Sequence, residues 1–168
     1  MKATFYFVPS FILPLLGIAQ SHSSESINSD APVVQSKSVV IDADPKKVWQ
    51  VLTAIEDWGT WNSRIKEPKL KSKLSLKSSF SWKINGAKIN STIETLIAEK
   101  TLGWSGKTFG AKALHYWYLE PVKGGTQVLV KESMEGWLIA LMRKKMNKTL
   151  ADDMEYWLEQ LKIECERN

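Results

Sequence analysis

Cysteine and histidine are scarce in this sequence, which limits the disulfide and metal chemistry that it can support. Cys165 is the single cysteine, so no disulfide can form within the chain. Only two histidines are present, and neither a CxxC nor an HExxH spacing occurs. We therefore expect no metal site. Phosphate-loop and dinucleotide-binding motifs are absent as well, so the sequence predicts no cofactor.

Strong positive charge is also missing. The formal net charge is +5 and the pI is about 9.2, a mild surplus without the clustered basic stripe of nucleic-acid-binding proteins. No basic platform interleaved with aromatic side chains is present to stack bases, so we expect no nucleic-acid partner. Residues 143–148 and the Lys-rich residues 71–77 are typical of solvated faces, and weak contact with acidic lipid head groups is the alternative.

Aromatic side chains, by contrast, are plentiful. The 168 residues are 43% hydrophobic, which suits one domain with a substantial core, and they include eight tryptophans. Because Trp is large, flat and polar at one edge, such an excess suits a pocket wall as well as a core.

Residues 1–19 are typical of a secretory signal peptide. Lys2 supplies a weak positive charge, the apolar run after it is too short and too Pro-broken to span a membrane well, and Gly17 and Ala19 place small residues where a signal peptidase cleaves. We expect export to the periplasm or the extracellular space, with an uncleaved N-terminal membrane anchor as the alternative. The Ser-rich residues 20–31 predict a disordered polar linker, and residues 32–168 the folded domain.

The domain is predicted to begin with a strand at residues 33–42. Asp44 as N-cap and Pro45 at the first helical position then indicate a helix through residue 52, and a second short helix follows at 55–61. Alternating segments joined by tight turns next predict an antiparallel meander of six strands at residues 65–70, 79–84, 87–98, 102–107, 111–120 and 126–134.

Residues 137–166 predict one continuous helix of about eight turns, because apolar residues recur there at steps of three or four without Pro or Gly. A stripe of this length needs a partner surface, which the meander supplies. The stripe consists of Leu138, Met142, Met146, Leu150, Met154, Trp157, Leu161 and Cys165.

The turn at Asn85-Gly86 sets the register of the sheet. A two-residue turn there pairs Trp82 with Ile89, and continuing the pattern gives one apolar, aromatic face and one charged face, as a half-buried sheet requires. One pairing, Lys107 with Lys112, is mildly unfavourable. The inward row is predicted to include Phe80, Trp82, Ile93, Thr95, Ile97, Trp104, His115, Trp117, Val130 and Glu132.

Six local motifs accompany this order of elements. They are Asp44-Pro45 before Val48-Trp49, Trp58 before Trp61-Asn62, residues 101–106, His115-Tyr116-Trp117, Gly125-Thr126, and Glu132-Ser133 before Gly136. In these residues the chain resembles the SRPBCC superfamily of START-like, birch-pollen-allergen-like helix-grip domains, and especially its polyketide cyclase/dehydrase-like branch.

The resemblance covers roughly residues 33–165 and implies an α+β helix-grip fold. In that fold a curved antiparallel sheet (β-α-α-β6-α) wraps around a long C-terminal helix and leaves a cavity for an apolar ligand. Members include lipid and sterol carriers, hormone receptors, aromatic-ring cyclases and chaperone cofactors, so the fold does not fix an activity. No catalytic motif is shared across the superfamily, and none is carried over here.

Two polar residues stand out in the inward row. The register places Trp104, His115 and Glu132 side by side on three neighbouring strands, where the two polar groups form either a self-satisfied core pair or an anchor for a polar ligand group. We expect a binding protein for a small hydrophobic or amphipathic ligand, lined by Trp61, Phe80, Trp82, Ile93, Trp104, His115, Trp117, Val130 and Glu132.

Two alternatives remain open from the sequence. A cyclase- or dehydratase-type enzyme would use His115 as general base, with Glu132 orienting it. An interaction module with a filled cavity would use the outer face of the sheet or the Lys patches instead. The ligand and the oligomeric state are not indicated.

Overall fold

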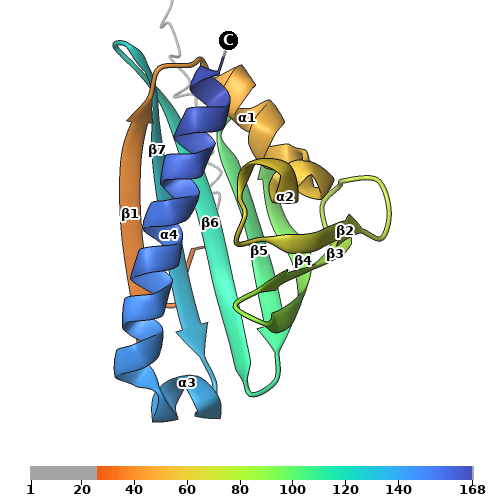
Figure 1. Ribbon diagram of the computed structural model, residues 1–168, viewed down its shortest axis with the longest axis vertical. Helices are drawn as coiled ribbons and strands as arrows, with labels where there is room; N and C mark the ends of the chain where they lie inside the picture. Colours follow the sequence, from red (N-terminus) through yellow and green to blue (C-terminus); the bar gives the residue numbers. More distant parts are fainter. Residues whose placement is uncertain (1–25, 168) are drawn as a thin grey trace, which may run out of the picture.

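The computed structural model describes residues 26–167, and the predicted signal peptide lies outside this range. Seven strands form one antiparallel sheet in the order β1-β7-β6-β5-β4-β3-β2, and the helices lie on one of its faces (Figure 1). The α+β helix-grip architecture is therefore as predicted. The elements are β1 (Val33–Ile41), α1 (Pro45–Thr53), η1 (Ile55–Asp57), α2 (Trp58–Trp61), β2 (Lys66–Leu70), β3 (Ser79–Ile84), β4 (Ala87–Ile97), β5 (Thr101–Thr108), β6 (Ala111–Val122), β7 (Gly125–Glu135), α3 (Trp137–Leu141) and α4 (Arg143–Glu166).

The helix-start and hairpin-turn residues identified in the sequence mark the start of α1 and the β3–β4 turn. The side chain of Asp44 accepts a hydrogen bond of 2.8 Å from the backbone N–H of Lys47, and Pro45 opens α1. Asn85 and Gly86 both have positive φ, as a two-residue hairpin turn demands. Trp82 accordingly pairs with Ile89, and the predicted pairing of Lys107 with Lys112 is also present.

The inward row departs from the prediction in the second half of β4. Ile93 pairs with Trp104, but the register shifts before Thr95, which pairs with Gly103. This bulge reverses the alternation, so that Leu96 packs against the core and Ile97 is 48% exposed. The inward assignment of Thr95 and Ile97 was wrong, because a one-residue bulge moves the side chains that follow to the opposite face.

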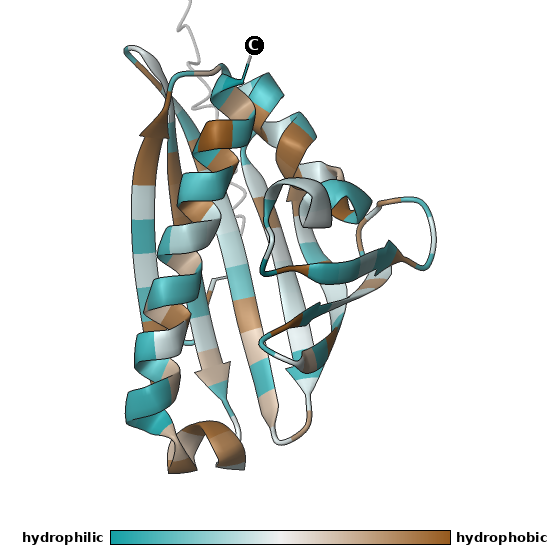
Figure 2. Ribbon diagram, viewed as in Figure 1, coloured by the Kyte–Doolittle hydropathy of each residue, from teal (hydrophilic) through white to brown (hydrophobic). Residues whose placement is uncertain are grey.

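The predicted continuous C-terminal helix is broken at Met142, whose backbone (φ −106°, ψ 23°) ends α3 before α4 begins. The backbone N–H of Leu138 donates to Gly110 O at 3.2 Å, which holds α3 on the β5–β6 turn, while α4 lies along β1. Both pieces keep the apolar periodicity, so the pattern alone did not reveal the bend. In Figure 2, α3 is largely hydrophobic and the visible side of α4 largely hydrophilic.

The predicted linker, residues 20–31, is described from residue 26 onward, and its last part is attached to the domain. The backbone N–H of Asn28 donates to Ser133 Oγ at 3.0 Å, and its side-chain amide reaches Glu135. These hydrogen bonds connect Asn28 to β7, and the disorder of residues 20–31 stays a prediction. Among the helices of residues 26–167, none combines the length and apolar content needed to cross a membrane.

Candidate functional site

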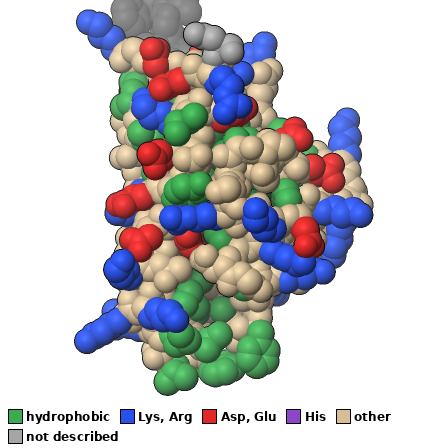
Figure 3. Space-filling view, viewed as in Figure 1, with side chains coloured by type: hydrophobic (Ala, Val, Ile, Leu, Met, Phe, Trp, Pro, Cys, Tyr) green, Lys and Arg blue, Asp and Glu red, His purple; other side chains and the backbone are tan. Residues whose placement is uncertain are grey.

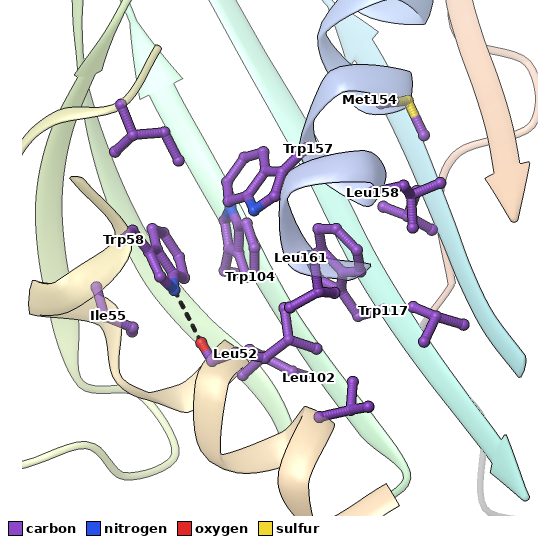
Figure 4. Close-up of a cluster of buried hydrophobic side chains, with 14 of the residues drawn as sticks. Leu52, Ile55, Trp58, Leu102, Trp104, Trp117, Met154, Trp157, Leu158 and Leu161 are labelled. Atoms are coloured by element: carbon purple, nitrogen blue, oxygen red, sulfur yellow. Dashed lines mark hydrogen bonds between the residues drawn. The ribbon is translucent and has the colours of Figure 1, made fainter. Parts of the chain in front are cut away.

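A cluster of aromatic rings fills the middle of the space between sheet and helices (Figure 4). Trp58 on α2 lies at its centre, with ring centroids 5.4 Å from Trp104 on β5 and 5.3 Å from Trp157 on α4. Its indole Nε1–H donates to Leu52 O at 2.9 Å, so the one polar atom of this buried ring is satisfied. Phe80, Trp82 and Trp117 pack around these three rings. These six rings pack against one another, and we call them the aromatic floor.

A cavity of about 700 Å³ begins beside this floor and extends to the hairpin end of the sheet. Its size lies within the usual range for small-molecule sites. The wall comes from β3–β7, α3 and the part of α4 up to Trp157. Exposed residues mark where it meets solvent: Asn85, Lys107, Phe109, Lys112 and Lys145. The inner wall is mainly apolar and includes Ile89, Ala113, Met134, Ile139, Leu150 and Met154.

The predicted row of Trp104, His115 and Glu132 is present at the cavity wall. Trp104 pairs with His115 across β5 and β6, and His115 pairs with Glu132 across β6 and β7. The imidazole stacks on Trp104 with ring centroids 4.4 Å apart and an interplanar angle of 9°. His115 Nδ1 is hydrogen-bonded to Glu132 Oε2. His115 is 3% exposed, so the surrounding rings and the carboxylate fix its orientation.

The other imidazole nitrogen is buried and has no hydrogen-bond partner among the described residues. The Glu132 carboxylate holds the ring proton on Nδ1, so Nε2 of the neutral imidazole presents a lone pair. A buried polar atom without a partner costs roughly 1–3 kcal/mol. Trp157, which also lines the cavity, has a buried Nε1 without a hydrogen-bond partner. The inner part of the wall therefore holds one acceptor and one donor that no described residue satisfies.

Four of the nine predicted ligand-binding residues line the cavity: Trp82, Trp104, His115 and Glu132. Trp61 instead borders a separate small cleft beside α1. The remaining four, Phe80, Ile93, Trp117 and Val130, are fully buried core residues outside the cavity wall. Five of the nine side chains therefore lie outside the wall of this cavity, and the aromatic cluster occupies the middle of the space between sheet and helices.

Sequence reasoning missed other parts of the wall. Trp157 belonged to the helical stripe, and its position opposite the sheet could have marked it as lining. Leu138, Ile139 and Met142 reach the cavity only because α3 turns away from α4. No local pattern indicates that bend. Phe109, in the β5–β6 turn, also lines the cavity.

Charge at the rim is mainly positive. Lys112 Nζ lies 2.6 Å from Glu135 Oε1, and this hydrogen bond, together with the one from Asn28, holds the pKa of Glu135 below its ordinary value despite partial desolvation. Lys107 and Lys145 make no salt bridge within residues 26–167. In the same range, no group of three or more His, Cys, Asp or Glu side chains is placed to hold a metal ion.

A family comparison agrees with this architecture. The sequence model of the family described as "Polyketide cyclase / dehydrase and lipid transport" matches residues 33–166. The chain belongs to this family. The predicted SRPBCC-type resemblance and its polyketide cyclase/dehydrase-like branch are thereby confirmed. A comparison of this family member with curated proteins found no match.

Solved structures show the same fold at low sequence identity. A hypothetical protein of Helicobacter pylori has a TM-score of 0.75 at 17% identity, over 97% of this chain and 100% of the other. The Zhui aromatase/cyclase of Streptomyces sp. R1128 has a TM-score of 0.69 at 11% identity, over 80% and 93%. The di-domain aromatase/cyclase StfQ from the steffimycin pathway has a TM-score of 0.68 at 11% identity, over 78% and 49%. At these sequence identities, the likeness to solved structures shows only the fold of this family member.

Proposed function

We propose that this protein binds a small amphipathic molecule in the cavity between β3–β7 and the α3–α4 segment. The observation that carries the proposal is a cavity of about 700 Å³ with a mainly apolar wall, to which His115 contributes a buried imidazole nitrogen without a partner. Desolvation of apolar ligand surface would drive binding, at roughly 25 cal/mol per Å². The few polar groups would set orientation and specificity.

The positions of the polar groups suggest the class of ligand. His115 Nε2, beside the aromatic floor, would accept a hydrogen bond from a hydroxyl. The cationic side chains stand at the other end of the cavity, where exposed Lys145 of α4 borders the rim together with Lys107 and Lys112 of the β5–β6 hairpin. An apolar skeleton with an inner hydroxyl and an outer acidic group fits this arrangement. Native mass spectrometry of protein from its own host would identify a retained molecule.

A matched pair of probes tests the hydroxyl contact. Pyrene and 1-hydroxypyrene differ by one hydroxyl, and both accept energy from Trp emission. We expect both to bind, and 1-hydroxypyrene to bind more tightly by roughly fivefold, the value of one net hydrogen bond. In His115→Phe, which keeps an aromatic ring on Trp104, the two affinities should become equal. A preference that persists in this variant would remove His115 from the proposal, and failure of both probes to bind the wild type would count against the cavity.

The alternative is an enzyme of cyclase or dehydratase type, favoured by the same Nε2 lone pair with a carboxylate behind the ring. His115 would take a proton from an acidic C–H of the bound molecule, and Glu132 would stabilise the resulting imidazolium. A molecule retained from the host would then exchange hydrogen for deuterium in D2O with the wild type but not with His115→Gln. Unchanged exchange in His115→Gln would exclude the dyad as the base, and no exchange with either protein would leave binding alone.

A further inference from the structure

The end of the molecule formed by α3 and the β5–β6 turn exposes three large apolar side chains. Phe109 is 79% exposed, Trp137 60% and Leu141 77%. Figure 3 shows hydrophobic side chains gathered at this end, below a surface of mixed charge. Single exposed apolar residues are ordinary, but a contiguous group marks an interaction surface. We call these three residues the apolar tip.

The exposure of the apolar tip is built into the backbone. Phe109 and Trp137 meet edge to face with ring centroids 5.6 Å apart. A Cβ on Gly110, whose φ is +67°, would lie 2.9 Å from the Trp137 ring, and one on Gly136, whose φ is +123°, would lie 2.4 Å from Gly110 O. Both turns therefore need glycine. The two segments interlock, and they keep both rings exposed.

Positive charge borders the apolar tip. Arg143, Lys144 and Lys145 open α4, one residue after the end of α3. They are exposed and make no salt bridge within residues 26–167. The acidic side chains of the same region are already engaged: Asp152 with Lys148, and Glu135 with Lys112. The tip is thus an apolar point beside uncompensated cationic groups.

We propose that the apolar tip docks on the surface of an anionic lipid bilayer, with Arg143 and Lys144 at the acidic head groups. Trp prefers the interface between water and hydrocarbon, and each nearby Lys or Arg favours an anionic surface. A second copy of the chain fits less well, because contact between two tips would bring the Arg143–Lys145 clusters together. Phe109 of the tip and Leu138 beside it also line the cavity. Docking would therefore bring the cavity opening to the bilayer surface. This last step rests on the proposed ligand binding.

Vesicle flotation with matched variants tests the docking. Wild-type protein should float with vesicles of phosphatidylcholine containing phosphatidylglycerol and not with phosphatidylcholine alone. Trp137→Ser/Leu141→Ser changes the tip without changing the cavity wall, and should abolish flotation. Leu76→Ser/Ile163→Ser removes comparably exposed apolar side chains elsewhere (58% and 50%) and should float as the wild type does. Arg143→Gln/Lys144→Gln should weaken partitioning roughly 30-fold.

Three results would overturn the docking. They are wild-type protein that does not float, equal loss in the tip and control variants, and tip-dependent dimers in sedimentation without vesicle binding. Pyrene binding, measured without vesicles, reports separately on the cavity. If pyrene binds and flotation fails, only the docking is wrong; if flotation succeeds and no ligand binds, only the proposed function is wrong.

Discussion

Replacing the His115–Glu132 pair by apolar residues should separate its structural role from its functional one. His115→Phe preserves a ring stacked on Trp104 but leaves the Glu132 carboxylate, whose side chain is 13% exposed, without its partner. Breaking a buried pair from one side typically costs 3–5 kcal/mol, and the residual exposure of Glu132 favours the lower end. We therefore expect a loss of about 3 kcal/mol in the free energy of unfolding.

The double variant His115→Phe/Glu132→Leu should recover that loss. It removes the stranded carboxylate and the unpartnered Nε2 together, and buried ion pairs replaced by apolar residues are often neutral or better. Its unfolding free energy should lie within about 1 kcal/mol of the wild type.

Urea unfolding followed by Trp emission measures these differences. With a slope of about 2 kcal/mol per molar urea, the single variant should unfold roughly 1.5 M earlier and the double variant near the wild-type midpoint. Both should lose the preference for 1-hydroxypyrene. A double variant as unstable as the single one would refute the reasoning, since the pair would then be needed for the fold.

Two further predictions concern the rest of the domain. Gly103→Ala should cost about 1–3 kcal/mol in urea unfolding, because its Cβ would lie 2.3 Å from the Tyr116 ring; an equal cost in a Tyr116→Leu background would contradict this cause. Burial raises the pKa of the Cys165 thiol to about 12, against a weaker opposing effect of Lys47, from an ordinary value of 9.0. The unfolded thiol thus loses its proton first, so the unfolding free energy should fall by roughly 1.4 kcal/mol per pH unit between those values. Urea titrations of the wild type should show this slope above pH 9 and not below it, and its persistence in Cys165→Ala would assign it to another group.

The fold was predictable because local and long-range signals agree. Asp44-Pro45 specified a helix start, Asn85-Gly86 specified a hairpin, and alternation carried the register across five strands to Glu132. The contact between His115 and Glu132 followed from pairing alone. Side-chain alternation has a period of two, so a correct turn fixes every position until a bulge intervenes.

The extent of the cavity was not predictable, because it depends on which large side chains meet. Trp58 and Trp157 come from separate helices and fill the space beside Phe80 and Trp117. Helical periodicity shows that Trp157 faces inward, but not that an indole from α2 meets it there. The bend at Met142 likewise depends on the contact of α3 with the β5–β6 turn. No sequence pattern near Met142 indicates this contact.

Binding of pyrene to a variant with a filled cavity tests the central claim most directly. Ala113 lies on the inner wall between Gly106 and Met134, and Ala113→Phe would occupy the cavity. Ala98→Phe makes the same change at an exposed turn. Energy transfer from Trp should show saturable binding in the wild type and Ala98→Phe, weakened roughly 10-fold or more in Ala113→Phe. Equal affinity in all three proteins, each verified as folded by its urea midpoint, would contradict the claim that the ligand site is this cavity.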